Sequence, residues 1–163
     1  MQMKKPTWHE TLLILGLALL AVFIVQSDIV RAQTTGKAPV FTDFRSRLAL
    51  DGYDAVAYFK AGKPEKGNPA HAVTWNGATW HFANAENKAA FEADPMAFAP
   101  QYGGYCAWAV AEGYTAKGDP NHWRIVGGKL YVNYNASVQK TWEKDIPGRI
   151  AKGDRNWPVV LSK

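Results

Sequence analysis

The chain is poor in cysteine, with one residue, Cys106, among 163. A single thiol excludes a framework of disulfide bonds within the chain. It also excludes any zinc or iron–sulfur site that needs several thiolates from one chain. Clustered charge is absent too. The 19 Lys and Arg residues and 14 acids give a net charge of +5, and they alternate along the chain. Because nucleic-acid binding needs a basic patch or stripe, we expect no nucleic-acid partner.

The chain also lacks a long hydrophobic run. Its most apolar stretch, Leu12–Val25, is 14 residues long, which is shorter than the roughly 20 residues of a membrane-spanning helix. A start containing Lys4 and Lys5, followed by a short apolar run, is typical of a secretory signal peptide, and Ala32 offers a small residue for cleavage. We therefore predict that residues 1–32 are a signal peptide and that the protein is periplasmic or secreted. The alternative is an uncleaved membrane anchor formed by residues 11–27.

No pattern in the sequence indicates a particular catalytic reaction. There is no carboxylate pair, nucleophilic triad or phosphate-binding glycine loop that stands out. Asp51 and Asp54 could act as acids or ligands, but Asp54 directly precedes a short predicted helix, residues 55–59, and an N-cap is the simpler role. We therefore expect a binding protein more than an enzyme, and the sequence leaves both open.

The chain is rich in aromatic residues, which make up 13% of it, with seven Trp, seven Tyr and seven Phe. The sequence also repeats at a constant offset of 51 residues, which pairs Trp80 with Tyr131 and Phe91 with Trp142. When residues 52–94 are compared with residues 103–145, eleven of 43 positions are identical without a gap. Such a register indicates an internal duplication, although two unrelated units with similar turns are the alternative.

Each copy predicts a β-hairpin. In the first, residues 73–82 place Asn76-Gly77 between two apolar segments, and Asn-Gly favours a tight turn with positive φ angles. In the second, residues 123–134 place Gly127-Gly128 at the same point. Two hairpins are therefore expected.

A helix is predicted after each hairpin. Asn84 and Asn135 are suitable N-caps for helices over residues 85–93 and 136–144. Proline follows at 95 and 147 and is expected to end each helix.

These elements predict an α+β fold in which two pseudo-symmetric β-hairpin–helix (ββα) units pack as one small domain. A lone two-stranded hairpin is only marginally stable in water, so each half should cover the apolar face of the other. The predicted boundaries are a linker over residues 33–47 and a domain over residues 48–158, with repeats over residues 51–97 and 102–148.

Three segments resemble the YHS-domain family: DGYDAVAYF (51–59), the stretch from WNGATWHF to GGYCAWAV (75–110), and GGKLYVNYNASVQKTWEKDIPG (127–148). The chain is most similar to the small exported members that carry this domain alone. The resemblance implies a relationship to small metal-binding modules that occur beside copper and other heavy-metal transport proteins. The metal-binding form of the family has three cysteines per motif, and at those positions this chain keeps only Cys106.

Cys106, His71 and His122 are the candidate metal ligands. A thiolate suits soft ions such as Cu(I), and two imidazoles with one thiolate form a ligand set that copper sites use. His71 and His122 occupy equivalent positions in the two copies, so they either converge near a symmetry axis or lie apart. The alternatives for Cys106 are a small buried hydrophobic residue, a nucleophile or an intermolecular disulfide.

Four aromatic residues are candidates to line a ligand pocket, with core packing as the alternative: Tyr53, Tyr102, Tyr105 and Trp108. We therefore predict an exported YHS-domain protein that binds a metal ion, copper first, near Cys106 as a carrier, buffer or sensor. The alternative is a metal-free module that binds a small molecule or a protein in an aromatic-lined groove.

Overall fold

The computed structural model describes residues 36–163, so the predicted leader over residues 1–32 lies outside the described residues. Residues 37–163 pack together as one unit. Within the described range, no helix is long and apolar enough to cross a membrane. Part of the predicted linker packs against the domain: Val40 is buried, and the Phe41 N–H donates to the Gly103 carbonyl at 2.9 Å.

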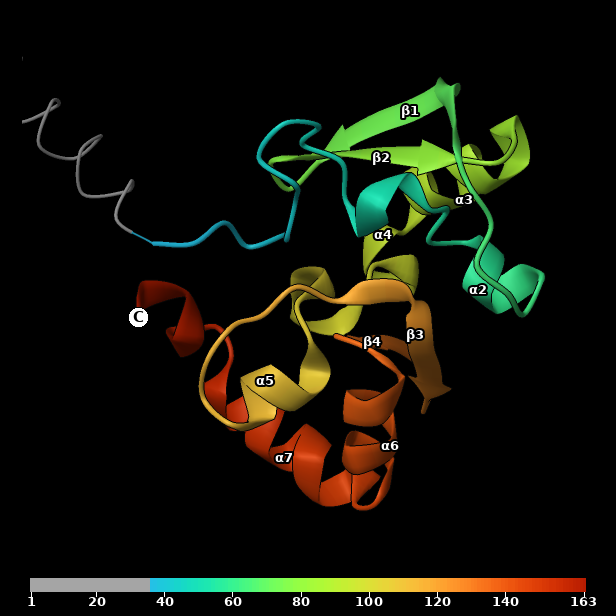
Figure 1. The fold of residues 1–163 in the computed structure, drawn as a ribbon. Helices are drawn as coiled ribbons and strands as arrows, with labels where there is room; N and C mark the ends of the chain where they lie inside the picture. The colour runs from blue at the N-terminus through green and yellow to red at the C-terminus, as the bar shows by residue number, and fades with distance from the viewer. Residues whose placement is uncertain (1–35) are drawn as a thin grey trace, which may run out of the picture. The chain divides into compact units, whose positions relative to one another are not determined.

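The fold is mixed α+β, as predicted. It contains two separate antiparallel hairpins, β1 (Asn68–Trp75) with β2 (Ala78–Phe82) and β3 (Asp119–Val126) with β4 (Lys129–Asn133) (Figure 1). Every strand of the second hairpin begins and ends 51 residues after its counterpart in the first. The register of each hairpin is interrupted at the same relative point, between Asn68 and Ala72 and between Asp119 and Trp123.

The predicted turns are confirmed. Asn76 and Gly77 have φ angles of 49° and 78°, and Gly127 and Gly128 have φ angles of 56° and 73°. These positive angles give the backbone twist that a two-residue hairpin turn needs. The strands extend further toward the N-terminus than predicted, to Asn68 and Asp119, because pairing resumes beyond each irregularity.

The predicted helix starts are also confirmed. Asn84 accepts a hydrogen bond from the Asn87 N–H at 2.8 Å and begins α3 (Ala85–Ala93). Asn135 accepts one from the Val138 N–H at 2.9 Å and begins α6 (Ala136–Glu143). These bonds satisfy amides that have no partner within the helix.

The prolines after these helices also begin new ones. Asp94 caps α4 (Pro95–Phe98), and Asp145 caps α7 (Ile146–Asn156), with a proline in the first turn of each. Proline is well tolerated there, because the first amides of a helix have no intrahelical acceptor. The eleven-residue α7 has no counterpart among the predicted elements. The remaining short elements are η1 (Leu50–Gly52), α2 (Ala57–Lys60), η2 (Gln101–Gly104), α5 (Ala107–Ala111) and η3 (Val159–Ser162).

The core consists of two clusters rich in aromatic rings. The first surrounds Trp80 and Phe91, and it includes Leu130 and Val132 from the second hairpin. The second surrounds Trp142. Strand β4 therefore contributes to the first cluster as well as to its own half. Burial of rings of this size supplies most of the apolar area that stabilises a small domain.

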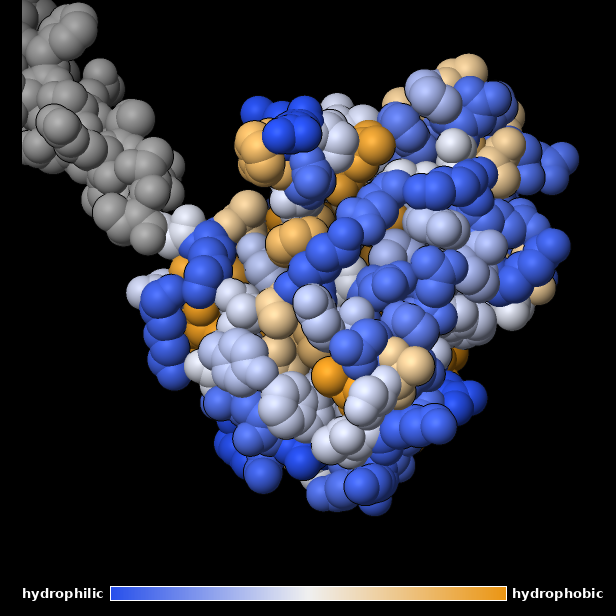
Figure 2. Space-filling view, in the orientation of Figure 1, coloured by the Kyte–Doolittle hydropathy of each residue, from blue (hydrophilic) through white to orange (hydrophobic). Residues whose placement is uncertain are grey.

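Of the 19 aromatic side chains in residues 36–163, eight are buried and three are exposed. The face shown in Figure 2 is mainly hydrophilic, with smaller hydrophobic areas between the charged side chains. Aromatic residues that do reach the surface are therefore informative about where a ligand could bind.

Candidate functional site

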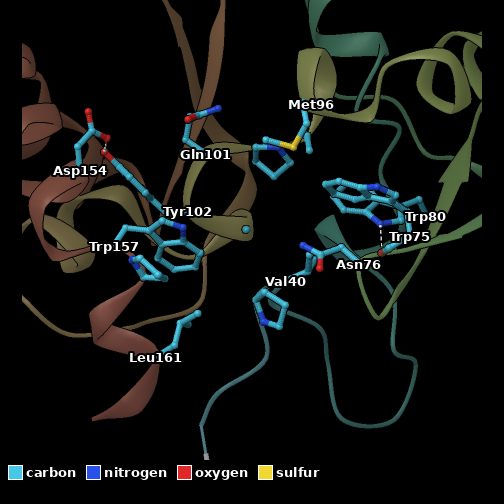
Figure 3. Close-up of a pocket in the computed structure, with 15 residues that line it drawn as sticks. Val40, Trp75, Asn76, Trp80, Met96, Gln101, Tyr102, Asp154, Trp157 and Leu161 are labelled. Carbon is cyan, nitrogen blue, oxygen red and sulfur yellow. Dashed lines mark hydrogen bonds between the residues drawn. The ribbon is translucent and has the colours of Figure 1, made fainter. Parts of the chain in front are cut away.

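A cavity of about 280 Å³ lies between the tip of the β1–β2 hairpin, the η2 segment and the C-terminal end of α7. Trp75 and Trp80 lie on one side of it and Tyr102 and Trp157 on the other, with Met96 at its edge (Figure 3). The walls thus come from segments that are far apart in the sequence. They border a partly open space, and four of its 15 lining residues are aromatic.

The hairpin wall is held rigidly. The Trp80 indole N–H donates to the Trp75 carbonyl at 3.1 Å, and both rings pack against Phe91. Trp80 is 1% exposed, whereas Trp75 is half-buried. The Trp75 side chain is therefore positioned before any ligand binds, which lowers the entropy lost on binding.

The opposite wall depends on Tyr102. Its φ angle is 55°, which is unusual for a bulky residue and costs on the order of 1–2 kcal/mol. The Tyr102 hydroxyl donates to Asp154 Oδ1 at 2.8 Å, and the Ile150 carbonyl oxygen is 3.3 Å away. Burial, and then this bond to Asp154, raise the pKa of Tyr102 above its usual value. The phenol thus remains a neutral donor across the physiological pH range.

Two glycines let the segments of this wall approach closely. A Cβ at Gly153 would lie 2.5 Å from the Tyr102 hydroxyl, so Gly153 makes room for the phenol beside α7. A Cβ at Gly103 would overlap the Pro39 carbonyl. The contact at Gly103 brings Pro39 and Val40 to the base of the cavity, where both line it.

Of the four aromatic residues predicted to line a pocket, Tyr102 lines this cavity. Tyr105 lines a second cavity, where its hydroxyl donates to the Ala38 carbonyl at 2.9 Å. Trp108 lines a third cavity beside Cys106. Tyr53 lines none of these three, and its ring lies under the Lys66 ammonium at 4.0 Å from the centroid. The four residues therefore do not line one common pocket.

The predicted metal ligands are not gathered into one cluster. Within residues 36–163, no group of three or more His, Cys, Asp or Glu side chains is close enough together to hold a metal ion. His122 lies 3.9 Å from Asp119, while His71 is half-buried on β1. The Cys106 thiol is 3.8 Å from Asn133 Oδ1. Copper binding near Cys106 stays a prediction that no geometric feature of the described residues supports.

Cys106 is 1% exposed, which matches the alternative of a small buried side chain. Burial raises the pKa of the Cys106 thiol. The thiolate is the nucleophile, so native protein should react with a disulfide reagent on the order of 100-fold more slowly than unfolded protein at pH 7.5. The labelling rate of native protein should rise as the pH is increased toward and above the usual pKa of a thiol. Absorbance-monitored labelling with and without guanidinium measures both, and equal rates in the two states would contradict the buried position.

Sequence reasoning missed the residues that complete the cavity, namely Trp75, Trp80, Met96, Asp154 and Trp157. The three Trp residues of this set were visible in the sequence as aromatic residues, but the sequence did not show that they line one cavity. Trp157 and Asp154 belong to the end of α7, which was not predicted, and they reach the first hairpin only in the folded chain.

Comparisons with known proteins identify no relative: no family model, no curated protein and no solved structure matches this chain. The resemblance to the YHS-domain family therefore stays a prediction, and the site is interpreted from its own geometry.

Proposed function

We propose that this protein is a binding module for a small organic molecule with a flat apolar ring, held in the cavity between Trp75 and Trp157. The observation that carries the proposal is the pair of aromatic walls, of which the hairpin wall is fixed by Trp80 and the other by Tyr102. Ligand pockets are typically preformed concavities with apolar and aromatic walls and a few polar groups.

The size of the cavity limits the ligand. Its volume of about 280 Å³ lies near the lower end of the range for ligand sites, and a cavity of roughly 150 Å³ already accommodates benzene. The proposed ligand is therefore a single ring, or two fused rings, with a short substituent.

The fold supports a second part of the proposal, that the two halves are pseudo-symmetric copies derived by duplication. The 51-residue offset extends from the strands to the caps, since Asn84 and Asn135, and then Asp94 and Asp145, have the same roles. The copies differ after the last cap. There α4 has four residues, whereas α7 has eleven and continues to the cavity. The proposed site thus uses the segment that is unique to the second copy.

Benzyl alcohol is a suitable neutral probe for this proposal. Titrated into the full chain, it should shift the indole N–H resonances of Trp75 and Trp157 in NMR spectra and leave that of Trp108 unchanged. Trp157→Ala should weaken binding about tenfold, because the substitution removes one wall and a tenfold change corresponds to about 1.4 kcal/mol.

The matched control is Trp108→Ala, which removes a half-buried indole that lines a different cavity. Its affinity for benzyl alcohol should equal that of the wild type once both are shown to be folded by circular dichroism. Shifts spread evenly over all the indoles, or equal weakening by the two substitutions, would contradict the proposal.

A further inference from the structure

One negatively charged side chain, Asp154, lines the cavity. Among the residues that line it, all in the described part of the chain, Asp154 is the one acid, and there is no Lys, Arg or His. The neutral Tyr102 phenol donates to Asp154 Oδ1, and no other hydrogen bond or ion pair to Asp154 occurs within residues 36–163. Asp154 is exposed at the rim of the cavity, beyond the Tyr102 phenol (Figure 3), so its second carboxylate oxygen is accessible to a ligand from solvent.

The neighbouring basic residues on α7 do not neutralise this carboxylate. Lys152 and Arg155 are two positions before and one position after Asp154, and side chains at these spacings do not face each other on a helix. Neither residue lines the cavity. Within residues 36–163, no basic side chain therefore pairs with the negative charge at its edge.

The aromatic walls, like Asp154, favour a positively charged ligand. The faces of indole and phenol rings attract cations within about 6 Å of the ring centroid, Trp most strongly. The cavity has indole rings on two sides, and the side-chain amides of Asn76 and Gln101, which both donate and accept hydrogen bonds, favour neither sign of charge. An anion would meet these ring faces and Asp154 without a cationic partner.

We infer that the ligand of this cavity is a small arylalkyl ammonium ion, with its ring between the indoles and its ammonium group at Asp154. This inference rests on the proposed function and names the class of molecule that the cavity takes. Attraction between an ammonium group and a carboxylate near the protein surface supplies discrimination even where much of its energy is screened by water.

Three probes that share a phenyl ring and differ in charge test the inference: benzylammonium, benzyl alcohol and phenylacetate. Their dissociation constants for the full chain are measured by NMR titration in 20 mM salt. Benzylammonium should bind about tenfold more tightly than benzyl alcohol, and phenylacetate should bind most weakly.

Asp154→Asn removes the charge and keeps an amide oxygen that accepts from the Tyr102 hydroxyl. It should reduce the preference for benzylammonium over benzyl alcohol to within about twofold. Glu92→Gln, on the exposed side of α3 and outside the cavity lining, alters the net charge equally and should leave the preference intact.

The outcomes separate the two claims. If benzyl alcohol binds at the cavity but the three probes bind equally, or Asp154→Asn keeps the full preference, the inference is wrong and the proposed function stands. If none of the three probes shifts the resonances of Trp75 and Trp157, both claims are wrong.

Discussion

Replacing Asp54 by alanine should lower the free energy of unfolding by about 3–5 kcal/mol. Asp54 is fully buried. Its Oδ1 accepts from the N–H groups of Val56 and Ala57 at 2.8 and 3.2 Å, which start α2. Its Oδ2 accepts from the Ala83 N–H at 2.8 Å and the Asn87 side-chain amide at 2.7 Å, which joins the end of β2 to α3. The substitution leaves three buried donors and one half-buried donor without an acceptor.

Urea denaturation followed by circular dichroism measures this loss. Asp43 provides the matched control, because its carboxylate also accepts two backbone N–H bonds but lies on the exposed surface. Asp43→Ala should cost much less than Asp54→Ala, since water replaces the lost acceptor. A loss below 1 kcal/mol for Asp54→Ala would show that Asp54 does not join these elements.

Gly103→Ala should destabilise the protein by about 2–4 kcal/mol and also weaken benzyl alcohol binding. Gly103 has a φ angle of 61°, and an added Cβ would overlap the Pro39 carbonyl. Relieving that overlap moves the segment of Pro39 and Val40 and breaks the hydrogen bond from the Phe41 N–H to the Gly103 carbonyl. Both residues of that segment line the cavity, so binding and stability should fall together.

Gly62→Ala separates the two causes of this effect. Gly62 has a φ angle of 66°, but an added Cβ there meets nothing within 4 Å. It should therefore cost about 1 kcal/mol from backbone strain alone and leave binding unchanged. Thermal unfolding with the NMR titration compares the pair, and equal losses for the two substitutions would mean that the contact with Pro39 has no energetic role.

The local elements could be predicted because their causes are local. A hairpin turn depends on residues that tolerate positive φ, such as Gly77 and Gly128, and a helix start depends on an acceptor side chain, such as Asn84 and Asn135. Each cause acts within about four residues, and these turns and caps were correctly predicted. The alternation that places Trp80 and Phe82 in the core and leaves His81 half-buried is equally local.

The candidate site could be predicted only in its chemistry. An aromatic-lined pocket was one of two alternatives that the sequence offered. Of the four residues named for it, only Tyr102 lines the cavity between the β1–β2 hairpin and the end of α7. Helix α7 escaped prediction because Ile146-Pro147-Gly148 is typical of a helix end. The Asp145 side chain instead accepts from the Gly148 N–H at 3.0 Å, and Pro147 stands in the first turn of α7.

The sequence by itself determined the α+β class, the two hairpins with their turns, and the helix N-caps. It also determined a composition that is rich in aromatic residues and has one cysteine. Only the tertiary structure decided which rings face one another. It leaves Cys106 away from any cluster of metal-binding side chains in residues 36–163 and brings Trp157 and Asp154 opposite Trp75. The physical reason is that these side chains become neighbours through close contacts between segments that are distant in the sequence, above all those at Gly103 and Gly153. Such contacts produce no periodic pattern in the sequence.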